Sequence, residues 1–336
     1  MRLLSAALVA ALVALVGAAT PAEGTAPVRI VFTADTGMNP EVFTGMGKAT
    51  PTLAIIAGDL SYQVGSEQAY CDLVNGAITA PVAMLPGNHE GLDPQAGGGS
   101  NFAAYAACLP DRAGAKPLYG GFPTDYLIDL PNVRLILISP NIATGNPGCP
   151  NGKCSYANGT PEQAALLTAI ADAKKARKWV VVVQHEPSFG YTIGNHATDV
   201  WGTASPDLAA AEIKAGVAVV VSGHDHNYAR SKPQGVTTFV TVGNGGYYPK
   251  PIGSLGTMWA SGSGTNSPGG IDIGYLQLDI STLKIAASEV SVLGPHAGQV
   301  FDRFTVKGPV RSALASVPAF GTSLEGRTAV PTATSR

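Results

Sequence analysis

Short apolar runs rich in β-branched residues recur along this sequence, and each run ends in a polar or glycine-rich loop. Runs of this kind are typical of buried strands. The predicted strands cover residues 28–34, 53–57, 81–85, 133–139, 179–184, 217–222 and 237–242. The clearest helix between them covers residues 161–178, where Thr160 is a good N-cap, proline opens the first turn and basic residues close the last. Strands that alternate with helices predict an α/β protein.

The N-terminus carries an apolar stretch of a different kind. Met1 and Arg2 precede an apolar run over residues 3–16, and small residues follow it. This order predicts a secretory signal peptide over residues 1–19, with cleavage between Ala18 and Ala22. An uncleaved anchor is the alternative, but the run falls just short of the roughly 20 residues that cross a bilayer. We therefore expect a secreted or periplasmic protein that is free of the membrane after cleavage.

Composition narrows the choice of partner. Hydrophobic residues make up 45% of the chain, which is enough for a sizeable core, and the formal net charge is only −2, with no block of lysine or arginine. This balance argues against nucleic acid and favours a small substrate, and it leaves the oligomeric state open. One catalytic domain is predicted over residues 27–308. Residues 309–336 show no periodicity and are predicted to form a disordered tail.

Four cysteines in an exported chain predict two disulfides. Cys149 and Cys154 bracket a turn-forming stretch, Pro-Asn-Gly-Lys, that could bring their sulfurs together, which leaves Cys71 to pair with Cys108. A thiolate zinc site is the alternative, but the paired short spacings of such sites are missing.

Metal-binding residue types follow successive predicted strands. In chain order they are Asp35, Asp59, Asn88, His185 and the pair His224 and His226. Because ligands of α/β sheets collect beyond the carboxyl ends of strands, we expect these side chains to meet at one edge. Taken singly, each has a structural explanation: an aspartate after a strand is commonly a helix cap or turn former, and a lone buried histidine is commonly a core residue. Their repeated placement together favours a metal site.

These residues stand in recognisable blocks. The blocks are Asp35-Thr-Gly37, Gly58-Asp59-Leu-Ser-Tyr62, Gly87-Asn-His-Glu90, a valine-rich strand closed by His185, and Gly223-His-Asp-His226. The series resembles the signature of the purple acid phosphatases within the calcineurin-like metallophosphoesterases. The wider superfamily usually has histidine where Gly37 stands and lacks a tyrosine in the place of Tyr62. The resemblance implies a four-layer α/β/β/α sandwich with a single catalytic domain.

The resemblance also implies two metal ions. One set of ligands is Asp35, Tyr62 and His226, and the other is Asn88, His185 and His224, with Asp59 as the bridge. The first set is hard and anionic and suits Fe(III), whereas the second is less charged and suits a divalent ion such as Zn, Fe or Mn. For Tyr62, the alternative is a buried aromatic residue of the core.

The predicted chemistry is hydrolysis of phosphate monoesters, as in acid phosphatases. Two cations would polarise the ester and lower the pKa of a bound water, so that a metal-bound hydroxide attacks phosphorus. His89 is the candidate acid for the leaving group. His196 is a candidate substrate contact, with an exposed loop residue as the alternative, and His296 is expected at the surface. A phosphodiesterase or nucleotidase on the same scaffold stays open, as does a secreted binding protein without catalysis.

Overall fold

The fold is built from strands and helices that largely alternate along the chain. The computed structural model describes residues 26–92, 102–189, 205–250, 252, 255, 257, 259–263 and 270–308. The strands are β1 Val28–Thr33, β2 Leu53–Ala57, β3 Val82–Leu85, β4 Lys116–Pro117, β5 Tyr126–Asp129, β6 Val133–Leu137, β7 Trp179–Val183, β8 Val219–Ser222, β9 Tyr228–Ser231, β10 Thr238–Val242, β11 Trp259–Gly262, β12 Ile273–Ile280, β13 Lys284–Leu293 and β14 Val300–Lys307. The helices are α1 Pro40–Lys48, α2 Glu67–Ala77, α3 Phe102–Cys108, α4 Pro161–Lys175 and α5 Ser205–Ala215, with a 3-10 turn at Pro150–Gly152.

The strands form two sheets. The six-stranded sheet has the order β14-β13-β12-β1-β2-β3, and the eight-stranded sheet has the order β11-β9-β10-β8-β7-β6-β5-β4. In the first sheet β1, β2 and β3 run parallel, and in the second β6, β7, β8 and β10 do. The parallel strands of each sheet therefore end at a common edge.

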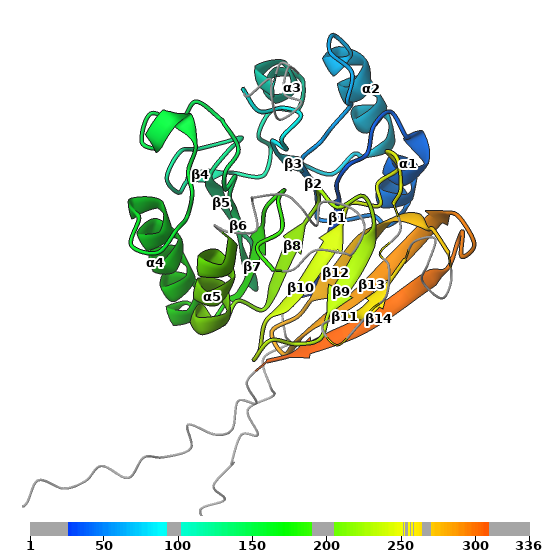
Figure 1. Cartoon of the computed structure of the whole chain (residues 1–336). Coiled ribbons are helices and arrows are strands. Elements are labelled where there is room, and N and C mark those ends of the chain that lie inside the picture. Colours follow the sequence, from blue (N-terminus) through cyan, green and yellow to red (C-terminus); the bar gives the residue numbers. More distant parts are fainter. Residues whose placement is uncertain are drawn as a thin grey trace, which may run out of the picture.

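Three apolar clusters define four layers. One cluster lies between the sheets and includes Ile30 and Phe32 of β1 together with Val181 of β7. Val31, which points to the opposite face of β1, packs in a second cluster with residues of α1, α2 and α3. A third cluster joins the outer face of the eight-stranded sheet to α4 and α5. Figure 1 shows α4 and α5 on the side of the molecule away from α1 and α2. This α/β/β/α sandwich is the architecture that the resemblance to the metallophosphoesterases implied, and it agrees with the α/β class predicted from the strand and helix pattern.

Each predicted strand is a strand in the structure, with ends that differ by at most two residues. The predicted helix 161–178 begins as expected but stops at Lys175. Arg177 takes a left-handed conformation with φ 58°, and Lys178 N donates to Ala173 O at 2.9 Å. This pattern closes a helix, because it satisfies carbonyl groups of the last turn and turns the chain away.

The cysteines pair as expected. Cys71 is bonded to Cys108, with 5.9 Å between their Cα atoms, and Cys149 to Cys154, with 4.9 Å. The helices of the described ranges include none that is long and apolar enough to cross a membrane. The predicted signal peptide and the predicted tail over residues 309–336 lie outside the described residues.

Candidate metal centre and active site

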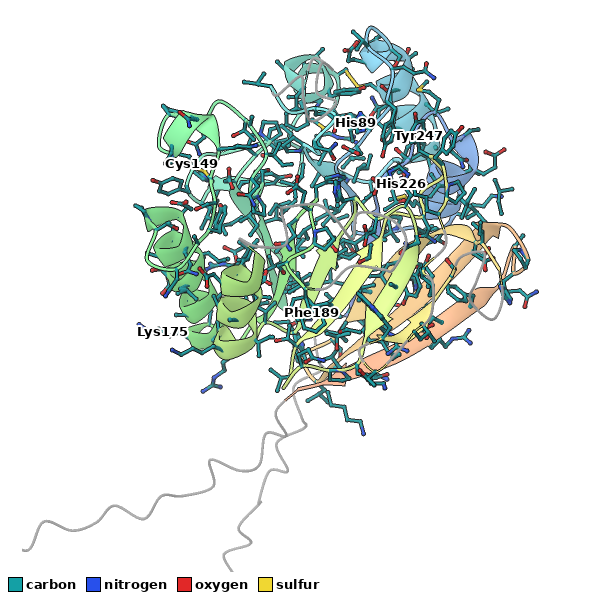
Figure 2. All side chains as sticks on the ribbon, in the orientation of Figure 1. His89, Cys149, Lys175, Phe189, His226 and Tyr247 are labelled. Carbon is teal, nitrogen blue, oxygen red and sulfur yellow. A yellow bond between two sulfur atoms is a disulfide. The ribbon has the colours of Figure 1, made fainter. Side chains whose placement is uncertain are left out.

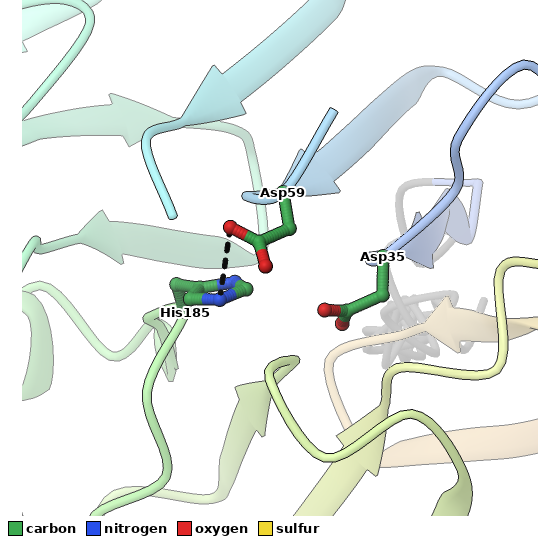
Figure 3. A group of neighbouring side chains, drawn as sticks. All are labelled: Asp35, Asp59 and His185. Atoms are coloured by element: carbon green, nitrogen blue, oxygen red, sulfur yellow. Dashed lines mark ion pairs between the residues drawn. The ribbon is translucent and has the colours of Figure 1, made fainter. Parts of the chain in front are cut away.

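The loops that follow β1, β2, β3, β7 and β8 meet at the edge where the parallel strands of both sheets end. The six-stranded sheet contributes Asp35, Asp59 and Asn88, and the eight-stranded sheet contributes His185, His224 and His226. A backbone hydrogen bond from Ala34 N to Val242 O, 3.2 Å long, ties the two sheets together here. Figure 3 shows Asp35, Asp59 and His185, which are buried and whose ligand atoms all lie within 4.8 Å of one another.

The backbone of these loops is unusual. Asp35, Asp59, Tyr62 and His224 all adopt the left-handed conformation, with φ of 55°, 51°, 58° and 69°. For residues other than glycine this conformation costs about 1–3 kcal/mol each and persists only when the surroundings hold it. These loop conformations therefore lower the stability of the fold, but they direct the four side chains toward the same site.

A first group of donor atoms surrounds the hydroxyl of Tyr62. Its Oη lies 2.9 Å from Asp35 Oδ1, 2.9 Å from Asp59 Oδ2 and 3.0 Å from His226 Nε2. His226 is oriented by its other ring nitrogen, because Nδ1 lies 3.2 Å from Tyr248 O. That contact turns Nε2 toward the group.

A second group centres on the amide oxygen of Asn88. Asn88 Oδ1 lies 3.3 Å from His185 Nε2 and 3.0 Å from His224 Nδ1. Asp59 also reaches this group, since its Oδ1 lies 3.4 Å from His185 Nε2. His185 Nδ1 lies 2.8 Å from Ala57 O, so a proton on Nδ1 leaves the lone pair of Nε2 facing the group.

Proton counting shows that the donor set fits cations. A phenol has one proton, so the Tyr62 hydroxyl cannot satisfy both Asp35 and Asp59 at once. Around a single ion at about 2.0–2.2 Å, neighbouring ligand atoms lie about 2.8–3.6 Å apart, from octahedral to tetrahedral geometry, and the distances of 2.9–3.0 Å seen here fall in that range. Burial and the charges of Asp35 and Asp59 raise the pKa of Tyr62 well above its ordinary value. A bound cation reverses that preference, because it stabilises the phenolate.

Asp59 and His185 shift each other's pKa. Burial works against the charged form of His185, but the neighbouring carboxylates, above all Asp59, raise its pKa to about 10. Burial also opposes ionisation of Asp59, yet the imidazoles around it, first His185, hold its pKa below the ordinary value. Without a metal, therefore, a proton on His185 takes the place of a cation beside Asp59.

Glu90 holds the loops that carry the proposed ligands. The sequence did not reveal this role, although Glu90 is the last residue of the block Gly87-Asn-His-Glu90. Its carboxylate accepts hydrogen bonds from the backbone nitrogens of Asp59, Leu60 and Gly87, at 2.9–3.0 Å. Burial, with the charge of Asp59, raises its pKa to about 7. Glu90 thus fixes the turns that carry Asp59 and Asn88.

A cavity of about 440 Å³ opens over the donor groups. It is lined by Asp59, Asn88, His89, His224, His226, Tyr247, Tyr248 and Lys250. Figure 2 shows His89, His226 and Tyr247 near one another in the upper right part of the view. Tyr247, Tyr248 and Lys250 were not predicted, because no local pattern marks them. They reach the site because Tyr247 N donates to Asp35 O at 2.9 Å, and Lys250 N to His226 O at 2.9 Å.

The other three histidines were predicted to lie in the active site or at the surface, and the structure describes two of them. His89 lines the cavity, with its backbone nitrogen 3.0 Å from Asp59 Oδ1 and its Nε2 3.9 Å from Asp59 Oδ2. His196 lies outside the described residues. His296 keeps 33% of its side chain exposed, so it lies at the surface as expected, but it also has a structural partner. Its Nδ1 lies 2.7 Å from the buried carboxylate of Asp272, and its ring stacks on Phe301.

Comparison with known proteins identifies the family of this chain. The sequence profile of the calcineurin-like phosphoesterases matches residues 28–228. The chain belongs to this family. As a calcineurin-like phosphoesterase it is a metal-dependent phosphoric ester hydrolase, and the matched region contains every predicted metal ligand. A comparison with curated protein sequences gives no match.

Solved structures share the fold at low sequence identity. The purple acid phosphatase PPD1 from yellow lupin (Lupinus luteus) seeds superposes with a TM-score of 0.63 and 18% identity, over 84% of this chain and 54% of the lupin chain. GAP50, described as the anchor in the inner membrane complex of Plasmodium, gives 0.55 and 16%, over 84% and 89%. A dimetal phosphatase from Danio rerio gives 0.53 and 10%, over 84% and 99%. This calcineurin-like phosphoesterase thus spans about half of the lupin structure.

Proposed function

We propose that this chain is an exported phosphomonoesterase of the acid-phosphatase type that works with two metal ions bridged by Asp59. One observation carries the proposal: the two carboxylate oxygens of Asp59 face different groups of donor atoms. Oδ2 lies 2.9 Å from Tyr62 Oη, whereas Oδ1 lies 3.4 Å from His185 Nε2. A carboxylate shared in this way would suit a bridge between two metal ions.

The two groups suit different ions. Asp35, Tyr62 and His226 would hold the first ion, and Asn88, His185 and His224 the second. With its carboxylate and phenolate, the first group suits Fe(III), and the second, with one neutral amide and two imidazoles, suits Zn, Fe or Mn in the divalent state. Tyr62 supports the purple acid phosphatase assignment in particular, since its hydroxyl lies within 3.0 Å of the other members of its group.

His89 and Lys250 are the residues to which we assign roles besides metal binding. When bound, the metal ions polarise the phosphoester and supply a nucleophile from water. His89 lies on the cavity wall with 35% of its side chain exposed, so it can reach a leaving group, and we assign it the proton that the leaving oxygen takes up. Lys250 adds a positive charge to the wall for the phosphate dianion. The disulfides support export, because they persist in oxidising compartments.

Hydrolysis of p-nitrophenyl phosphate and of bis(p-nitrophenyl) phosphate tests the proposal. We expect the monoester to be the better substrate, activity to disappear after treatment with a chelator, and metal to restore it. A preference for the diester would assign the chain to the phosphodiesterase alternative instead. A fully metal-loaded protein that turns over neither ester would support the binding protein without catalysis.

A further inference from the structure

Tyr62 is packed against a second tyrosine that belongs to none of the sequence blocks. The rings of Tyr62 and Tyr247 stack with 3.5 Å between centroids and 12° between planes. His89 also contacts the Tyr62 ring, at 4.5 Å and 57°. With the two planes nearly parallel and this close, the Tyr62 ring cannot tilt toward Tyr247 without a steric clash.

The position of Tyr247 is itself set by the metal-site loops. Its backbone nitrogen donates to Asp35 O at 2.9 Å, and Gly245 N donates to Ala34 O at 3.1 Å. Tyr247 is therefore anchored to Asp35, whose carboxylate lies 2.9 Å from the hydroxyl of Tyr62. The backbone of Asp35 holds one ring, and its side chain meets the other.

Gly37 leaves the room that Tyr247 occupies. A Cβ at Gly37 would lie 3.2 Å from Tyr247 Cδ2, and its φ of 55° is one that residues with a side chain rarely adopt. A larger residue at position 37 would push against the ring that stacks on Tyr62. The glycine and the two tyrosines thus form one packing unit.

We propose that Tyr247 is a positioning residue for Tyr62: its ring holds the Tyr62 phenol in the plane that directs Oη between Asp35, Asp59 and His226. The inference rests on the proposed function, in which that oxygen binds a metal ion. The Tyr247 ring also meets His226, but edge to face, with 5.8 Å between centroids and 68° between planes, so its closest ring contact is the stack on Tyr62.

A double-mutant cycle on metal affinity tests this role. Zn²⁺ is titrated into metal-free protein against a competing chelator, and the ion that Tyr62 contacts is recognised as the one weakened by Tyr62→Phe. We expect Tyr247→Leu to raise its dissociation constant roughly threefold to tenfold, the scale of one aromatic stack, and Tyr247→Phe, which keeps the ring, to leave it within about twofold. In the Tyr62→Phe background, Tyr247→Leu should have no further effect.

The outcomes separate this inference from the function on which it rests. Equal losses from Tyr247→Leu in both backgrounds, or no loss in the wild type, would overturn the role of Tyr247 and leave the metal site standing. A wild type that binds no Zn²⁺ at all would overturn the proposed function, and the positioning role with it. Near-UV circular dichroism of the metal-free variants checks that each protein keeps its fold.

Discussion

Replacement of Gly87 by alanine tests how closely the protein backbone holds the bridging carboxylate. A Cβ at Gly87 would lie 2.0 Å from Asp59 Oδ1, although ordinary contact begins near 3.4 Å. The carboxylate would therefore have to move by about 1.4 Å, the difference between these distances, and the backbone of Asp59 would have to shift as well, because its nitrogen would lie 2.5 Å from the same Cβ. The φ of Gly87 lies outside the left-handed range, so the effect is steric and does not come from a strained backbone.

A displacement of this size is large for an active site. A shift of about 1 Å in catalytic geometry can cost roughly 10²-fold in rate, so we expect Gly87→Ala to lose at least about 10²-fold in kcat/KM. Because Asp59 is proposed to serve both ions, the variant should also retain less metal. The assays are monoester hydrolysis and the metal content of the purified protein, with far-UV circular dichroism as the check on the fold.

Gly76→Ala is the matched control. Gly76 lies in α2, and a Cβ there meets nothing within 4 Å. Alanine in a helix is favoured over glycine by about 0.5–1 kcal/mol, so this variant should be as active as the wild type and slightly more stable. If Gly87→Ala keeps wild-type metal content and rate, the reasoning that places Asp59 between the two donor groups is refuted.

Other substitutions separate the roles of individual residues. His89→Ala should keep both metals and lose roughly 10²-fold or more in kcat, the scale of a general acid. The control His296→Gln should leave kcat unchanged. Loss of metal from His89→Ala would mean that His89 has a structural role instead. Tyr62→Phe should abolish the visible absorption band of the oxidised iron protein, and a wild type without such a band would move the chain away from the purple acid phosphatases. Burial raises the pKa of Glu212 to about 8, so the folded protein keeps a proton there that the unfolded chain releases above about pH 4.5. The contribution of Glu212 to stability should therefore fall as pH rises from about 4.5 to 8, by an amount on the order of a few kcal/mol, and the melting temperature of Glu212→Gln should depend less steeply on pH than that of the wild type.

The sequence predicted the strands that carry the site because they are buried on both faces. β2 and β7 are nearly continuous apolar runs, which stand out without any knowledge of their neighbours. By contrast, β13 alternates between buried and half-buried positions and uses small residues such as Ala287 and Ser288, so its pattern is weak. β4, β5, β9 and β11 were missed because they have four residues or fewer, and β12 and β14 because polar residues such as Gln277 and Asp302 interrupt their apolar runs.

The same contrast applies to the site. The proposed ligands were found because each follows a strong strand within a few residues. Tyr247, Tyr248 and Lys250 follow β10 by several residues and line the cavity. Backbone hydrogen bonds to Asp35 and His226 hold this segment in place. Asp35 lies far from it in the sequence, and β9 and β10 separate it from His226, so no local pattern could reveal these contacts. Glu90 was visible in its block, but its role depends on three backbone nitrogens that only the folded loops bring together.

The central claim is that Asp59 joins two metal ions in one catalytic centre. Its most direct test is the metal content of the wild type and of Asp59→Ala, measured on the same preparations as the rate of p-nitrophenyl phosphate hydrolysis. The proposed centre predicts two ions per wild-type chain and, in Asp59→Ala, the loss of turnover together with the loss of metal, because each ion loses a negative ligand. An Asp59→Ala protein that keeps two ions and a near-normal rate would contradict it.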